Sequence, residues 1–196
     1  KEDIVIETLE RDGVSFVKKE YIDKKYGETA WIFKTAYSFF CKEAEKRIPK
    51  PDQAESPIWI FADEEAVFKS MGNTLLKLSV PKEEIIFFDL RDWNKVLNLC
   101  FLGSEEKENE FRNKLKSQGI KDNLDIINTP FYPLLKKELM DSWKQLFDRP
   151  NLCKKYTEGA VWQLKQEWVI EKYILYLTRY LYEQLKSIPN IEFSKG

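Results

Sequence analysis

Three short apolar segments in the middle of the chain constrain its fold most, because each is too short for a helix and rich in branched and aromatic residues. They are PIWIF (57–61), NTLLKLSV (73–80) and EEIIFFDL (83–90), and turn-like residues separate them. Such segments are typical of β-strands. The short connection between the last two predicts an antiparallel hairpin. We expect a small, mostly antiparallel sheet over about residues 57–90.

Helical periodicity surrounds these segments. Over residues 28–48, apolar side chains recur at every third or fourth position and charged residues fill the remainder, which predicts an amphipathic helix. A stretch without proline from residue 157 to 187 predicts a long C-terminal helix. The fold class is therefore α+β, with a helix-rich single domain over residues 1–196. Four further helices are expected to begin near a capping residue or a proline: Asp3, Asp92 (as the N-cap), Ser104 and Pro133.

The balance of charge limits the classes of partner. The chain carries 32 Lys and Arg against 33 Asp and Glu, a net charge of -1. No overall positive field attracts it to nucleic acid, so we expect no nucleic-acid partner. Its apolar runs are far shorter than the roughly 20 residues that span a bilayer. We expect a soluble, cytoplasmic protein without a membrane partner.

The absence of histidine removes several kinds of active site. The Ser-His-Asp triad, the Cys-His dyad and His-ligated zinc all need an imidazole, and the chain has none. Neither GxGxxG nor GxxxxGK is present, so the sequence identifies no cofactor. Asp89 and Asp92 are too few carboxylates to predict a Mg²⁺ site. Any chemistry would use carboxylates, Lys, Arg, Tyr, Ser or Thr, or a bound cofactor.

Polar residues on the expected C-terminal helix are candidates for function. Gln163, Glu167 and Glu171 would be i/i+4 neighbours on an arc flanked by apolar side chains. A carboxylate there must find a partner or hold a raised pKa. Glu167 is thus a candidate catalytic acid or base, and Gln163 and Glu171 are candidate binding residues. An ordinary ion pair or simple exposure is the alternative.

A second group of candidates follows the strand that ends at residue 90. Asp89 and Arg91 stand at the strand end, and Arg91 is available for a phosphate. Trp59 lies on a neighbouring predicted strand. If these residues form one site, we expect Glu167 or Gln163 to lie close to Trp59 or Arg91.

The order and spacing of several tryptophans resemble a known family. SPIWIF, LLKLSVPKEEIIFFDLRDWNKVLN, DSWKQLFD and AVWQLKQEWV resemble the bacterial domain-of-unknown-function family 3841 over about residues 3–172. The resemblance implies a bacterial setting, a short strand ahead of the first helix, and an Asp at the position of Asp89. It leaves residues 173–196 as a C-terminal helical extension. It implies no reaction, because the family has no established activity.

Two functions remain open at this point. The first is a partner- or ligand-binding domain, which could form a homo-oligomer through the C-terminal helix, because aromatic residues are enriched at interfaces. The second is a nucleotide-acting enzyme, similar to ADP-ribosyltransferases, that uses a carboxylate in place of histidine. Against it, Glu167 is expected in a helix, whereas that superfamily places its essential Glu on or beside a strand. For the first function, the C-terminal helix would present four tyrosines to a partner: Tyr173, Tyr176, Tyr180 and Tyr182.

Overall fold

The computed structural model of the chain describes residues 3–18, 27–63, 67, 74–148 and 154–174. The chain divides into two compact units. Unit 1 takes residues 1–15, 68–79 and 165–196, and unit 2 takes residues 16–67 and 80–164. Each unit therefore joins segments that are far apart in the sequence. The single domain expected from the sequence stays a prediction.

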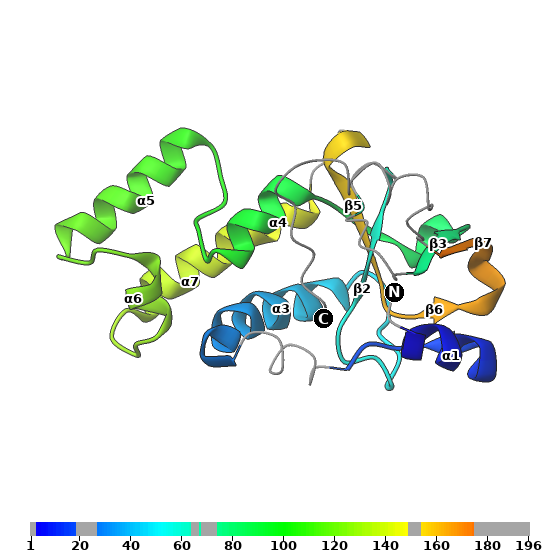
Figure 1. The fold of residues 1–196 in the computed structure, drawn as a ribbon. Helices are drawn as coiled ribbons and strands as arrows, with labels where there is room; N and C mark the ends of the chain where they lie inside the picture. Colours follow the sequence, from blue (N-terminus) through cyan, green and yellow to red (C-terminus); the bar gives the residue numbers. More distant parts are fainter. Residues whose placement is uncertain (1–2, 19–26, 64–66, 68–73, 149–153, 175–196) are drawn as a thin grey trace, which may run out of the picture. The chain divides into compact units, whose positions relative to one another are not determined.

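A three-stranded antiparallel sheet belongs to unit 2 (Figure 1). Its strand order is β2 (Ile58–Phe61), β5 (Thr157–Val161), β4 (Ile86–Asp89). The strands expected at 57–61 and 83–90 are confirmed. The expected hairpin is wrong, because β4 pairs with β5 and β3 (Thr74–Leu78) pairs with β7 in unit 1. These pairing partners lie more than 60 residues away, beyond what local turn signals specify.

Helices make up most of the rest of unit 2, so the α+β class is confirmed. Two of the predicted helix starts are confirmed. The Ser104 hydroxyl accepts a hydrogen bond from the Lys107 N–H, and Pro133 is the first residue of its helix. Short 3-10 helices are η1 (Gly27–Thr29), η3 (Lys82–Glu84) and η5 (Lys154–Tyr156). The longer elements are α3 (Ala30–Ala44), α4 (Leu90–Leu97), α5 (Glu105–Ser117), α6 (Asn123–Ile127), α7 (Pro133–Ser142) and the 3-10 helix η4 (Trp143–Phe147).

Aromatic side chains from α3, α4 and the sheet form the core of unit 2. Their ring centroids lie 5.0–6.2 Å apart, mostly edge to face. Such pairs add about 0.5–1.5 kcal/mol each beyond the burial of their area. The cluster fixes α3 against one face of the sheet. Its members are Tyr37, Phe40, Trp59, Phe88 and Trp93.

Unit 1 is smaller and contains α1 (Asp3–Asp12) and β1 (Val14–Ser15). Helix α1 ends at Asp12 and is followed by Gly13, whose φ of 73° is left-handed and whose N–H donates to the Leu9 carbonyl at 2.9 Å. Strands β3 and β7 (Val169–Ile174) pair antiparallel, and Lys77 bonds Glu171 across them at 2.7 Å. β6 (Leu164–Lys165) and η6 (Gln166–Trp168) precede β7.

The long helix expected from residue 157 is wrong for residues 157–174, which form β5, β6, η6 and β7. The segment is rich in Val, Ile and aromatic residues, which suit strands, and β2, β3 and β4 supply the pairing edges. Residues 175–196, with Tyr176, Tyr180 and Tyr182, lie outside the described residues, so the homo-oligomer through this segment stays a prediction. Within the part of the chain that is described, no helix has the length and apolar character needed to cross a bilayer.

Candidate functional site

A groove of about 680 Å³ lies in unit 2 between α3 and the α6–α7 segment. In Figure 1, α3 and α7 run side by side in the same sense along the chain, α3 in blue to cyan and α7 in yellow. The groove combines an apolar floor with basic walls. Its lining residues are Trp31, Lys34, Thr35, Ser38, Phe39, Lys42, Ile127, Asn128, Lys136, Met140, Asp141 and Lys144.

The basic residues of the groove follow helical spacing on both walls. On α3 the stripe is Lys34, Ser38, Lys42, and on α7 and η4 it is Lys136, Met140, Lys144, each at i, i+4 and i+8. Residues at this spacing share one face of a helix. Both stripes face the groove, which makes it a concentration of positive charge on a chain with a net charge near zero.

The ammonium groups differ in how much of their hydrogen-bonding capacity is used. Lys136 donates to the Ile127 carbonyl at 2.8 Å, which ties α7 to the end of α6. Lys42 is exposed and forms no hydrogen bond or ion pair with the described residues. An ammonium has three donors, so the lysines bonded once still have donors for a ligand.

The floor of the groove is held by the aromatic core beneath it. Phe39 is buried and meets the ring of Trp143 edge to face at 5.2 Å. Trp143 is fully buried, and its Nε1 donates to the Cys100 carbonyl at 2.8 Å. The floor therefore rests on a side chain with little freedom to move.

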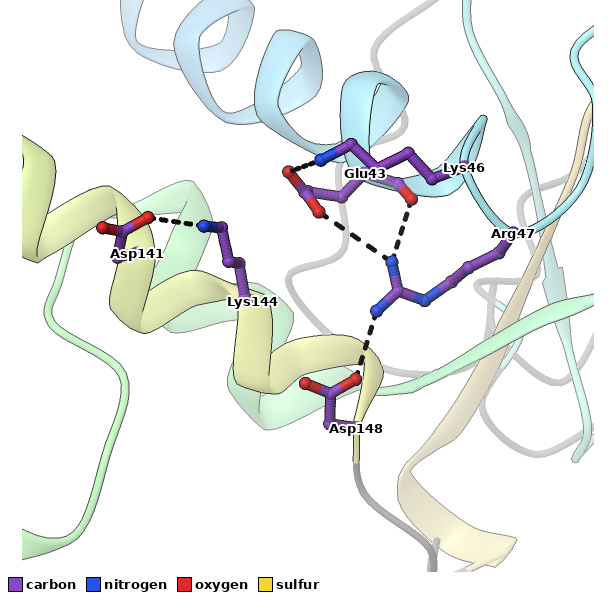
Figure 2. Close-up of polar contacts among 6 residues, drawn as sticks. All are labelled: Glu43, Lys46, Arg47, Asp141, Lys144 and Asp148. Carbon is purple, nitrogen blue, oxygen red and sulfur yellow. Dashed lines mark hydrogen bonds and ion pairs between the residues drawn. The ribbon is translucent and has the colours of Figure 1, made fainter.

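A network of carboxylates and cations joins the C-terminal ends of α3 and η4 (Figure 2). It lies beyond Lys42 and Lys144, and this end of the groove is called the closed end below. Arg47 at the end of α3 donates to Asp148, just after η4, at 3.1 Å. Arg47 also donates to the Glu43 carbonyl at 2.9 Å, and Lys46 donates to the Glu43 carboxylate at 2.6 Å. Glu43 is buried, and these two cations compensate its charge.

Asp141 introduces one negative charge into the groove, and two lysines neutralise it. Lys137 and Lys144 each donate to its carboxylate at 2.6 Å. These hydrogen bonds lower the pKa of Asp141 to about 2. The hydrogen bond to Asp141 also raises the pKa of Lys144, and the nearby Glu43 adds to the effect. Lys144 therefore stays charged at the groove end.

The structure corrects the predicted cap of α4. Asp89 is the N-cap, because α4 begins at Leu90 and the Asp89 side chain accepts from the Arg91 N–H at 2.8 Å. Asp92, expected as the cap, is a buried residue in the first turn. Asp89 also accepts from Arg91 Nε at 2.9 Å and Nη2 at 2.6 Å, and the guanidinium lies 4.3 Å over the Tyr156 ring. Asp89 and Arg91 are thus brought together, in a pair that also organises the strand-to-helix turn.

Replacing Asp89 with alanine is expected to cost about 2 kcal/mol of folding stability, the upper end for an N-cap, because Asp89 is buried and its loss also leaves Arg91 without its partner. Ser104→Ala, which removes an exposed cap in the same unit, should cost about 1 kcal/mol. Urea unfolding of the two variants measures the difference. Equal losses would show that the contacts to the Arg91 guanidinium add nothing to the cap.

The other predicted site residues lie on separate elements. Trp59 belongs to the core cluster, and its Nε1 donates to the Tyr37 hydroxyl at 3.0 Å. Gln163 follows β5, Glu167 lies in η6 with a side chain 72% exposed, and Glu171 lies in β7. The shared helical arc expected for the last three is wrong, because they stand on no common helix. The catalytic role of Glu167, the binding roles of these residues and the proximity of Glu167 or Gln163 to Trp59 or Arg91 stay predictions.

Sequence reasoning missed two features of unit 2. Glu158 is only 6% exposed on the central strand β5, and burial raises its pKa to about 7. Its only signal in the sequence was a glutamate just before the short apolar segment GAVW (159–162). Of the groove lysines, Lys42 was expected only as one of the charged residues of the amphipathic helix over 28–48, and the i/i+8 spacing of the lysines alone could not show that α7 lies opposite α3.

Comparison with known proteins places the chain in a family. The family model described as "Domain of unknown function (DUF3841)" matches residues 1–170. No curated protein and no solved structure matches the chain. The matched segment covers most of the chain and includes the whole groove, the Asp89–Arg91 pair and Glu158. The chain therefore belongs to the DUF3841 family of domains of unknown function.

Proposed function

We propose that this protein binds an anionic ligand of small-molecule size in the groove between α3 and α7. The observation that carries the proposal is the groove itself, which has a volume of about 680 Å³ and two lysines on each wall. Small-molecule sites typically measure about 300–1,000 Å³ and combine an apolar lining with a few placed polar groups. The groove has both properties.

The charges around the groove favour an anion. Four lysines and one aspartate line it, and the aspartate is already bonded by two lysines. Lys42 has no partner among the described residues, so a bound anion would complete its hydrogen bonds at no cost to an existing ion pair. The field is local, since the whole chain carries a net charge of -1.

The uncharged lining residues favour an apolar body on the same ligand. Trp31, Phe39 and Met140 provide aromatic and thioether surface, which adapts well to apolar groups. Ser38 and Asn128 add hydrogen-bonding groups at the exposed edges. A purely inorganic anion would leave this apolar surface uncovered, so we expect affinity to rise with an attached hydrocarbon or ring.

Methionine NMR gives a direct test, because the chain has two methionines and Met140 lies in the groove. With ¹³C-methyl methionine, Met71→Leu assigns the Met140 signal. Decanoate, decanol and decylamine share one chain length and differ in charge. We expect decanoate to shift the Met140 signal at concentrations at least tenfold lower than decylamine, because the lysines attract only the anion.

Lys42→Glu should weaken decanoate binding about tenfold, since it replaces attraction by repulsion at one wall; tenfold corresponds to about 1.4 kcal/mol. Lys107→Glu, the same charge change on the exposed first turn of α5, is the matched control and should bind as the native chain does. Binding that is insensitive to ligand charge, or equally weakened in both variants, would contradict the proposal.

The nucleotide-acting enzyme suggested by the sequence is kept as a second candidate. The observation that favours a carboxylate chemistry is Glu158, whose pKa of about 7 suits proton transfer near neutral pH. NAD and nucleotides belong in a thermal-shift panel beside the carboxylates, because a ligand that binds only the folded protein raises its melting temperature. Nucleotide turnover that survives both Glu158→Gln and Glu167→Gln would exclude a role for these carboxylates.

A further inference from the structure

The lysines of the groove are grouped at its two ends. Helix α3 and the α7–η4 segment have their C-terminal ends together, as the Arg47–Asp148 ion pair shows (Figure 2). Lys42 and Lys144 therefore stand toward this closed end, and Lys34 and Lys136 stand toward the other. Each wall separates its two lysines by eight residues, which is about 12 Å along a helix.

Among the described residues that line the groove, none between the two lysine pairs is a cation. Ser38 and Met140 occupy the i+4 positions between the lysines of the two stripes, and Phe39 forms the floor beneath them. An anionic group placed midway would lie about 6 Å along the helix axis from each lysine pair and against apolar surface, where burying a charge is unfavourable. The pattern along the groove is thus positive, apolar, positive.

We propose that the ligand is an elongated dianion, with a carboxylate or phosphate group at each end of an apolar body that spans about 12 Å. This inference rests on the proposed function and names the class of ligand for the same groove. One anionic group is bound between Lys42 and Lys144 and the other between Lys34 and Lys136. The apolar body lies over Phe39 and Met140.

The size of the groove is that of a small-molecule site. Its volume of about 680 Å³ lies within the roughly 300–1,000 Å³ typical of such sites. The proposal therefore names a small molecule, and not an acidic helix of a protein partner, as the ligand.

The closed end of the groove is able to bind one of the two anionic groups despite the acids nearby. Glu43 is bonded by Lys46, and Asp141 is bonded by Lys137 and Lys144. Neither carboxylate is left with uncompensated charge, and Lys42 adds a cation beyond these pairs. The end is net positive even when every acid in it is ionised.

A series of linear dicarboxylates tests the inference with the Met140 methyl signal as the readout. Adipate, sebacate and tetradecanedioate differ in length, and sebacate matches the lysine spacing most closely. We expect the affinity to peak at sebacate and to exceed that of decanoate at least tenfold. A matching bisphosphonate shows which anionic group is preferred, and tighter binding of either dianion than of its monoanion supports the inference.

Two variants connect the dianion to the two ends of the groove. Lys42→Gln and Lys136→Gln should each reduce sebacate affinity to near that of decanoate, because each weakens one end, while Lys107→Gln leaves it unchanged. Affinity that simply rises with chain length, with decanoate equal to sebacate, would overturn the dianion and leave the proposed function standing. An absence of binding by every anion would overturn both.

Discussion

Glu158→Gln is expected to stabilise the protein by about 3 kcal/mol at pH 8 and to leave its stability nearly unchanged at pH 4. Glu158 lies on β5 between β2 and β4, opposite Phe61 and Phe88. Opposite residues of antiparallel strands share a face of the sheet, so the carboxyl group lies among aromatic side chains. Among the described residues, no hydrogen bond or ion pair reaches it. Glutamine keeps the shape and removes the ionisation.

The direction of the pH effect follows from the raised pKa. Burial raises the pKa of Glu158 from 4.5 to about 7 in the folded protein. Between these two values the folded state binds the proton and the unfolded state does not, so stability falls as pH rises through this window. Above about pH 7 the destabilisation from the buried Glu158 carboxylate is fully present, and below about pH 4.5 it is absent.

Urea unfolding at pH 4.5, 6 and 8 measures this prediction. The free energy of unfolding of the native chain should fall across the series by more than that of Glu158→Gln. The difference in unfolding free energy between the two proteins should therefore widen as pH rises. Glu167→Gln changes an exposed carboxylate and is the matched control, with an expected effect within about 0.5 kcal/mol. A difference in unfolding free energy that stays constant with pH would show that ionising Glu158 costs the folded state no stability.

Trp143→Ala is expected to cost about 3–5 kcal/mol of stability, the range for deleting a buried tryptophan. The side chain is fully buried, donates to the Cys100 carbonyl and supports Phe39 beneath the groove. Its loss creates a large cavity and leaves the carbonyl of the half-buried Cys100 without this donor. Denaturant unfolding measures the cost.

The matched variant Trp143→Phe keeps an aromatic ring against Phe39 and loses only the hydrogen bond and part of the volume. It should cost about 1–3 kcal/mol and retain decanoate binding in the groove. If Trp143→Ala costs less than 1 kcal/mol, the floor of the groove does not depend on this side chain, and the packing argument fails.

Helices and isolated strands could be located from the sequence because their signals are local. Contacts within a few residues specify the helix around Phe40 and the helix starts at Ser104 and Pro133. The N-cap of α4 was misplaced, because Asp89 and Asp92 are both acceptable caps and only packing against the sheet selects between them.

Residues 157–174 show where local signals fail. Their spacing of apolar residues fits a helix wheel and their composition fits strands, and periodicity alone does not separate these alternatives in short apolar runs. Residues 157–161 form a strand because the edges of β2 and β4 both hydrogen-bond to them as β5. The acid at Glu158 was placed in the sheet by that pairing, where it meets Phe61 and Phe88.

The local order of residues was sufficient for the α+β class, the family and the lack of histidine chemistry, because each depends on residue type and short-range spacing. The groove depended on tertiary structure. Lys42 and Lys136 are 94 residues apart by number, and only the packing of α3 alongside α7 brings their stripes to one cavity. A lysine stripe on one helix alone is an ordinary solvated face. Two lysine stripes that face each other across a groove concentrate positive charge on both sides of an anionic ligand.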